Sequence, residues 1–158
     1  MATREIQHYE ILYYLNTTPG SGTPTYSLVN EGFTSLTKDN NPEMNDQHFI
    51  AEKQARTTLQ NYAVSWSLDN SFFEGDAVGD FILDLAFREA TGNDAASDLV
   101  EVHLYGTPRA KRRPVSMAID SQTVEGGNPL TGTTTVGSDG ELEFGTWDEA
   151  TLTFTPTP

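Results

Sequence analysis

The chain of 158 residues contains no cysteine, so it can form no disulfide and has no thiolate to serve as nucleophile or metal ligand. Basic residues are also scarce, because 9 lysines and arginines stand against 23 acidic residues, for a formal net charge of −14. A protein that grips nucleic acid replaces phosphate counterions with a broad basic surface. The composition therefore argues against nucleic-acid binding. The acidity alone has an equally good explanation, because a large net charge favours solubility.

Long apolar runs are missing too. No stretch approaches the roughly 20 apolar residues that cross a bilayer, and the opening residues MATREIQHYE lack the apolar core of an export signal. We therefore expect a soluble protein that does not insert into a membrane. A chain of this length can bury a sizeable core, so we expect one domain over residues 1–158.

The residue combinations that catalysis or metal binding requires are absent. His8, His48 and His103 lie far apart without metal-ligand spacing, and Gly20 to Gly22 are not followed by the lysine of a phosphate-binding loop. The stretch DNNPEMND lacks the central glycine and the terminal glutamate of a calcium loop. We therefore expect no metal, no cofactor and no enzymatic activity.

The clearest strand pattern covers residues 60–68. Its apolar positions include Tyr62, Val64, Trp66 and Leu68, and its other face is small and polar, formed by Asn61, Ala63, Ser65 and Ser67. A helix is expected next, over about residues 76–90, because Asp76 can accept hydrogen bonds from the free N–H groups at a helix start. We expect the strand and the helix to share one core, made of Tyr62, Val64, Trp66, Val78, Phe81, Ile82 and Leu85.

Most other segments alternate as β strands do. In residues 99–105, Val100, Val102 and Leu104 are expected to point inward and Glu101, His103 and Tyr105 outward. A turn signal at residues 30–32 separates two short strand candidates and suggests a hairpin. The predicted fold is mainly β, an antiparallel β-sandwich or flattened barrel with one flanking α-helix.

Residues 37–46 are polar and rich in turn formers, which predicts a long excursion from the sheet, a loop or hairpin arm within residues 37–56. Two arrangements stay open. Either a strand that begins at His48 pairs with one that begins at Thr57, so that the tip lies near residues 53–56, or the segment from Lys38 to Asp46 projects as a loop.

The order of these segments resembles the major tail tube proteins of long-tailed bacteriophages. The resemblance runs from about Tyr9 to Thr155 and is carried by SWSLDNSFFEGD, DAVGDFILDLAFREAT, VHLYG, RRPVSMAIDSQTVEGG and ELEFGTWDEATLTFT. It implies a β-sandwich with one flanking helix, of which six copies form a ring, and rings that stack into a tube through which DNA passes at ejection. Contractile injection tubes and tail-derived bacteriocins share this fold, so the type of particle stays open.

The resemblance also implies a location and partners. The location is the virion tail, with the host cytoplasm before assembly. The partners are further copies of the chain, together with tape measure, tail terminator and distal tail or baseplate proteins, and DNA passes through without binding. The termini, Met1 to Ile6 and Thr155 to Pro158, are expected to be flexible until assembly.

Several residues acquire expected roles from this resemblance. Residues 37–56 take the place of an arm that reaches the neighbouring ring, with Lys38, Asp39, Glu43, Asp46, Lys53 and Arg56 as its charged contacts. The basic cluster is either an inter-subunit patch or a charged strand edge, and it consists of Arg109, Lys111, Arg112 and Arg113. Carboxylates that line the tube would repel DNA, and Glu52 and Glu101 are the candidates. The tube wall is assigned to Asn61, Ala63, Ser65 and Ser67.

Two other classes of protein compete with this interpretation. One is a monomeric β-sandwich module that binds carbohydrate or protein, and the other is a β-sheet hydrolase. Size and electron microscopy separate them from a tube subunit, because only the tube subunit forms rings.

Overall fold

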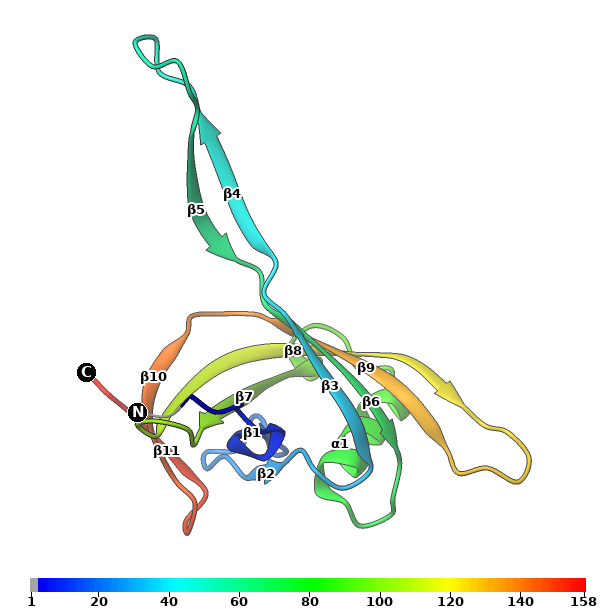
Figure 1. Cartoon of the computed structure of the whole chain (residues 1–158). Helices are drawn as coiled ribbons and strands as arrows, with labels where there is room; N and C mark the ends of the chain where they lie inside the picture. The colour runs from blue at the N-terminus through cyan, green and yellow to red at the C-terminus, as the bar shows by residue number, and fades with distance from the viewer. Residues whose placement is uncertain (1–2) are drawn as a thin grey trace.

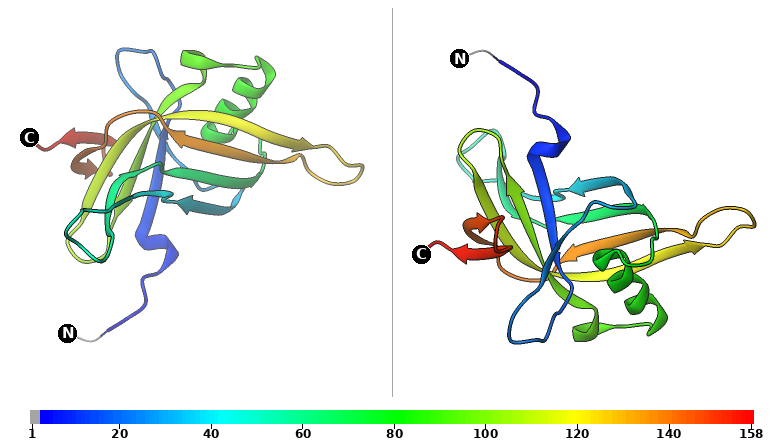
Figure 2. Two further views of the ribbon diagram at one scale, coloured as in Figure 1. Left: turned by 90° about the horizontal axis from the view of Figure 1, so that it is seen from above. Right: turned by 90° about the horizontal axis from the view of Figure 1, so that it is seen from below.

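The computed structural model describes residues 3–158, so Met1 and Ala2, the start of the expected flexible N-terminal segment, lie outside the described residues. The chain forms a curled antiparallel sheet, a half-barrel with one α-helix packed against it (Figures 1 and 2). This confirms the predicted class, mainly β with one flanking helix. In the part of the chain that is described, no helix is long and apolar enough to span a membrane.

The main sheet has the strand order β2-β1-β7-β8-β9-β6-β3, and β10 pairs with β8 and with β11. Its strands are β1 (Ile11–Asn16), β2 (Tyr26–Leu28), β3 (Phe33–Asp39), β6 (Ser65–Ser71), β7 (Ala96–His103), β8 (Arg109–Thr123), β9 (Thr131–Ser138), β10 (Glu143–Asp148) and β11 (Thr153–Pro156). A separate two-stranded sheet consists of β4 (Pro42–Gln47) and β5 (Arg56–Tyr62). Short 3-10 helices, η1 (His8–Glu10) and η2 (Gly92–Ala95), precede β1 and β7.

The helix α1 (Ala77–Phe87) begins where the sequence predicts. The Asp76 carboxylate accepts a hydrogen bond from the backbone N–H of Gly79 at 2.9 Å, which satisfies one of the free donors of the first turn. The helix ends at Phe87, short of the predicted residue 90, because Glu89 adopts a left-handed conformation with φ of 50°.

One core lies between α1 and the sheet. Val64, Trp66 and Leu68 of the β6 segment are buried against α1, together with side chains of β1, β7, β8 and β9. The helix contributes Val78, Ile82 and Leu85 to this core, and the half-buried Phe81 packs against its rim.

Tyr62 differs from the prediction, because 51% of it is exposed. The expected continuous strand over residues 60–68 is interrupted between Tyr62, which ends β5, and Ser65, which begins β6. The alternating pattern runs through this break, but the chain changes direction there. Tyr62 therefore belongs to the separate β4–β5 sheet.

A second core covers the opposite face of the sheet. Tyr14, Tyr26, Val100, Val102 and Ala110 are buried there, beneath Trp147 and Phe154 of the β10–β11 hairpin. Strand β7 is consequently covered on both faces, and the expectation that Glu101 points into solvent is wrong, because only 4% of Glu101 is exposed. Leu104, expected to point inward, lies beyond the end of β7 and is 42% exposed.

The turn at residues 30–32 joins β2 to β3, but these strands do not pair with each other. β2 pairs with β1, and β3 pairs with β6. Gly32 has a φ of 80°, and a Cβ at this position would lie 2.1 Å from the carbonyl oxygen of Ser71. The glycine is therefore required for the close approach of the turn to β6, not for a hairpin.

At the C-terminus, Thr155 and Pro156 lie in β11, and the N–H of Thr157 donates to the carbonyl of Phe144 at 2.9 Å. At the N-terminus, Arg4 pairs with Glu10, with one nitrogen–oxygen distance of 2.8 Å. The flexibility of both ends before assembly stays a prediction.

Candidate functional site

A two-stranded arm, residues 42–62, projects from the body of the protein (Figure 1). Its strands β4 and β5 are antiparallel, with Pro42 opposite Tyr62 and Gln47 opposite Arg56. Every residue of β5 is exposed, and within residues 3–158 the two strands pair only with each other. Asn41, with a left-handed φ of 42°, accepts a hydrogen bond from Ala63 at 3.2 Å where the arm leaves the sheet.

The arm exposes apolar side chains along its length and at its tip. Their exposed fractions range from 45% to 109%, for Met44, Phe49, Ile50, Leu59 and Tyr62. The arm has few interactions of its own to hold it, such as the hydrogen bond from Thr57 to Asp46 at 2.5 Å and an ion pair between Arg56 and Glu52. Within residues 3–158, these apolar side chains belong to neither of the two cores.

The structure has neither of the two arrangements that the sequence left open. A hairpin does project, but its strands are Pro42–Gln47 and Arg56–Tyr62, so the arm is displaced along the chain relative to the predicted 37–56. Glu43, Asp46, Lys53 and Arg56 lie in the arm. Lys38 and Asp39 instead belong to β3 in the main sheet. His48 to Ile50, expected to begin a strand, lie in the loop at the tip, and so does Glu52, which therefore lies on no strand face.

The basic cluster of residues 109–113 does not form one patch, because successive strand residues point to opposite faces. Lys111 and Arg113 line a pocket on the side of α1. Arg112 points to the other face, where its Nε donates to Glu143 at 2.7 Å and its guanidinium lies over Phe154. Arg109 is exposed at the end of β8, near the ring of Tyr105.

On the face turned away from α1, strands β3, β6, β9 and the segment 116–121 of β8 carry mainly hydroxyl and carboxylate side chains, and the paired rows of this region contain no lysine or arginine. We call this region the hydroxyl face. Directly paired residues point the same way, so three rows define it: Ser35, Asp69, Thr133 and Ser121; Thr37, Ser67, Thr135 and Ala118; and Asp39, Ser65, Gly137 and Ser116. Asp69 accepts hydrogen bonds from Ser35 at 2.9 Å and from Thr133 at 3.0 Å.

Two of the four expected wall residues, Ser65 and Ser67, lie on the hydroxyl face. Asn61 lies in the arm, opposite Glu43, and Ala63 lies in the link between the arm and β6. The remaining rows could not be recognised from the sequence, because only the pairing of distant strands brings them beside β6.

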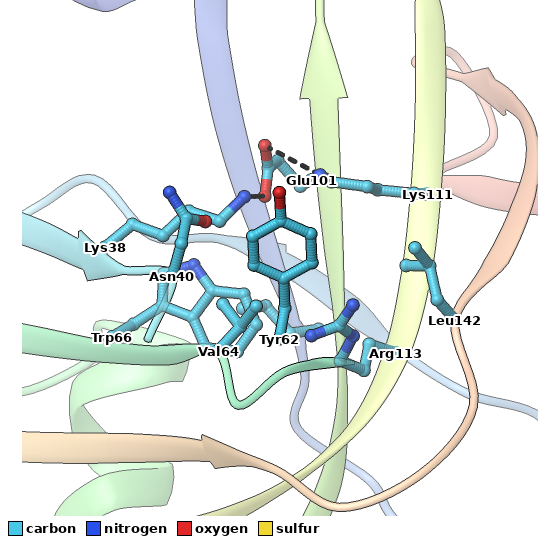
Figure 3. Close-up of a pocket in the computed structure, with 10 residues that line it drawn as sticks. Lys38, Asn40, Tyr62, Val64, Trp66, Glu101, Lys111, Arg113 and Leu142 are labelled. Carbon is cyan, nitrogen blue, oxygen red and sulfur yellow. Dashed lines mark hydrogen bonds and ion pairs between the residues drawn. The ribbon is translucent and has the colours of Figure 1, made fainter. Parts of the chain in front are cut away.

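A pocket of about 300 Å³ lies at the foot of the arm (Figure 3). Val64, Trp66 and Leu99 are among its apolar lining, and Lys38 and Lys111 reach the buried Glu101 from opposite sides. The Lys38 ammonium lies 2.9 Å from one carboxylate oxygen, and the Lys111 ammonium lies 3.5 Å from the other. The second oxygen also contacts Nε2 of His103, whose Nδ1 lies 3.0 Å from the hydroxyl of Tyr105.

These contacts decide the charge state of Glu101. Burial acts to raise the pKa of its carboxyl group, but hydrogen bonds from His103 and Lys38 and the charge of Lys111 outweigh burial, so the pKa is lowered. Burial lowers the pKa of Lys111; the attraction of Glu101 opposes this effect, whereas the charge of Lys38 adds to it. Glu101 is therefore ionised at neutral pH, at the centre of a cluster of cations.

Among the described residues, no group of three or more histidine, aspartate or glutamate side chains could hold a metal ion. No sequence signal identified the Glu101 cluster, because Lys38 and Glu101 are 63 residues apart and are joined only by the fold.

No family model and no curated protein matches the sequence. Solved structures do match the fold. A chain from the virion of the native gene transfer agent (GTA) particle aligns with a TM-score of 0.64 and 13% identity, over 90% of this chain and all of that chain. A chain from the tail of the empty GTA particle, described with C6 symmetry, aligns with a TM-score of 0.64 and 15% identity over the same shares.

The SPP1 tail tube is similar to the same degree. It aligns with a TM-score of 0.64 and 12% identity, over 92% of this chain and 83% of that chain. At such low identity the likeness shows the fold alone, and that fold is the one that the sequence resemblance predicts. The chain therefore has the fold of phage tail tube proteins.

Proposed function

We propose that this chain is a non-enzymatic structural subunit of a virion tail, which assembles into stacked hexameric rings and forms a tube that conducts DNA during ejection. The observation that carries this proposal is the exposed arm of residues 42–62. The number of six copies rests on the C6 symmetry of the GTA tail, whose chain has the same fold.

The arm needs a partner for physical reasons. An isolated two-stranded hairpin is marginally stable in water, because it cannot bury enough apolar surface to offset its lost conformational entropy. This arm nevertheless exposes Met44, Phe49, Ile50, Leu59 and Tyr62. Apolar side chains grouped on a projecting element mark an interaction surface. A neighbouring copy in the next ring would cover them.

The hydroxyl face suits the wall of a DNA conduit. It carries Asp39 and Asp69 and no cations, so it would repel phosphates instead of holding them by counterion release. These aspartates replace Glu52 and Glu101 as the lumen candidates, because Glu52 lies at the arm tip and Glu101 is buried.

The sheet behind the hydroxyl face offers two edges for ring formation. β3 pairs only with β6, and β8 beyond Ser116 pairs only with β9, within the described part of the chain. Unpaired strand edges are templates for pairing with another chain. Head-to-tail joining of copies through such edges closes into a ring when the rotation between them allows it.

Such a tube has two different ends, and we expect other proteins to complete them. Tape measure, tail terminator and distal tail or baseplate proteins are the partners that fit these positions. The chain would reside in the host cytoplasm before assembly and in the virion tail afterwards.

An arm variant tests the proposal. Ile50→Glu removes the apolar side chain that is 109% exposed at the arm tip, so the isolated subunit should keep its stability. If Ile50 is buried by a neighbour, its loss removes about 1.5–3 kcal/mol per contact, so the protein concentration needed for tubes should rise at least about tenfold. The measurement is sedimentation of the purified protein, with negative-stain electron microscopy of the pellet.

Gln54→Glu is the matched control, because it adds the same charge to the exposed tip without removing an apolar side chain. It should assemble like the unchanged protein. Tubes of Ile50→Glu at the unchanged concentration would contradict the role of the arm, and a chain that stays monomeric at high concentration would contradict the proposed function as a whole.

The pocket beside Glu101 favours one alternative, a monomeric β-sandwich module that binds a carbohydrate or protein ligand. Such a module would stay monomeric in size-exclusion chromatography, form no rings, and gain thermal stability with its ligand.

A further inference from the structure

The pocket at the foot of the arm holds more positive than negative charge. Three cations, Lys38, Lys111 and Arg113, line it together with one carboxylate, Glu101. Both oxygens of Glu101 are already engaged, by Lys38 on one side and by His103 and Lys111 on the other. Three of the nine lysines and arginines in a chain of net charge −14 therefore meet in one place.

Arg113 is the cation that Glu101 does not satisfy. Its Nε is buried and has no hydrogen-bond partner among residues 3–158. A buried donor without an acceptor is costly, and a charged one more so, unless a ligand supplies the acceptor. The remaining lining includes the apolar side chains of Val64, Trp66 and Leu142. The pocket thus combines a guanidinium whose Nε lacks an acceptor with apolar walls.

We propose that this pocket binds the carboxylate of an aspartate or glutamate side chain from a second copy of this chain. Arg113 would donate hydrogen bonds to the carboxylate, with Lys111 beside it, and the apolar walls would contact the methylene groups. The occupant follows from charge complementarity, since another copy presents 23 acidic residues against 9 basic ones. The choice of a second copy rests on the proposed function, whereas the chemistry of the pocket does not.

Because the pocket lies beside the foot of the arm, a side chain bound in it would also affect the arm. Asn40 and Tyr62 line it, and they flank the arm where it leaves the sheet. A neighbour's side chain held there would also hold the foot of the arm, so this contact and the seating of the arm would form together.

The two tryptophans allow a direct test in the soluble protein. Trp66 lines the pocket, and Trp147 lies in the second core on the opposite face of the sheet. Titration with glutarate, followed by the two indole N–H resonances, should shift that of Trp66 saturably and leave that of Trp147 unchanged. Arg113→Gln should weaken this binding at least about tenfold.

Arg88→Gln is the matched control. It makes the same change on the exposed end of α1, where Arg88 pairs with Asp84 at 2.9 Å, and it should bind glutarate like the unchanged protein. Arg113→Lys keeps the charge and should retain part of the binding. Circular dichroism checks that each variant is folded, and Lys111→Gln replaces Arg113→Gln if the latter is not.

A Trp66 resonance that does not respond to glutarate would overturn the proposal, as would equal binding by Arg113→Gln. Phosphate that binds as well as glutarate would overturn the assignment to a carboxylate. In assembly assays, Arg113→Gln should need a higher protein concentration than Arg88→Gln to form tubes. Equal assembly of Arg113→Gln and Arg88→Gln would exclude a second copy as the occupant. A chain that forms no tubes at all would contradict the proposed function. The glutarate titration would still decide the chemistry of the pocket in that case.

Discussion

Glu101 shows how one residue can hold distant parts of the fold together. It lies on β7, and its carboxylate joins Lys38 of β3 and Lys111 of β8. These strands do not all neighbour one another in the sheet, so the contact spans the inside of the half-barrel. Because Glu101 is buried, removing it should destabilise the protein more than removing one member of an exposed ion pair would.

We predict that Glu101→Gln destabilises the protein at neutral pH. Removing one member of a buried ion pair leaves an unpaired charge and costs about 3–5 kcal/mol, and the partial exposure of both lysines should reduce the loss to about 2–3 kcal/mol. Urea unfolding measures this loss. Glu74→Gln, at an exposed position, should change the unfolding free energy by less than about 0.5 kcal/mol.

The same contact predicts a pH dependence. The folded state lowers the pKa of Glu101 from its ordinary value of 4.5, so the carboxylate stabilises the fold fully above that value. This stabilisation is lost as the pH falls through the lowered pKa. The difference in unfolding free energy between Glu101→Gln and the unchanged protein should therefore shrink in acid, and an equal difference at neutral and acidic pH would contradict the role of the charge.

At the scale of elements, the helix and the arm differ in what stabilises them. Helix α1 has a capped start and an apolar face buried in the main core. The arm has neither a core nor neighbouring strands in the described chain. The helix should therefore be stable in the isolated subunit, and the arm should depend on assembly for its order.

We predict that Asp76→Ala lowers the unfolding free energy by about 1 kcal/mol, the usual loss for a helix N-cap. The reason is that the N–H of Gly79 loses its acceptor at 2.9 Å. Asp76→Asn keeps an acceptor oxygen and should restore most of the loss. Chemical denaturation of the three proteins checks this order, and equal stability of the Ala and Asn variants would show that the cap contributes nothing.

At the scale of the whole molecule, charge is distributed by face. The net charge is −14, the hydroxyl face has no cations, and Lys38, Lys111 and Arg113 are turned into the pocket. A tube built from such subunits would present carboxylates to DNA and keep these cations away from it.

We predict that neither the subunit nor the tube retains duplex DNA at physiological salt. Non-specific DNA-binding proteins dissociate in the range of about 1–100 µM, and a surface without a basic footprint should show no binding over that range. A sedimentation assay with labelled linear DNA tests this prediction. Co-sedimentation of DNA with washed tubes would contradict a freely passing conduit.

Much of the fold could be predicted from the sequence because its signals are local. The start of α1 follows from Asp76 and from apolar residues at helical spacing, and the buried side of β6 follows from the alternation of Val64, Trp66 and Leu68. The order of strands and helix was enough for the resemblance to tail tube proteins, and the fold confirms it.

The candidate site was less predictable. An alternating sequence pattern indicates which residues share a face of a strand, but it does not indicate what packs against that face. The pattern therefore predicted that Glu101 points into solvent, although the β10–β11 hairpin and Lys38 cover the two sides of β7. It also continued through Tyr62, where the chain turns away into the arm.

By itself, the sequence determined the start of α1, the buried side of β6, the excess of acid and the absence of cysteine chemistry, since these depend on composition and on neighbours along the chain. Only the tertiary structure decided that the basic cluster is divided between two faces, that three cations share one pocket with Glu101, and that the hydroxyl face is continuous. The physical reason is that these features join residues far apart in sequence, and their positions are set by strand pairing and packing.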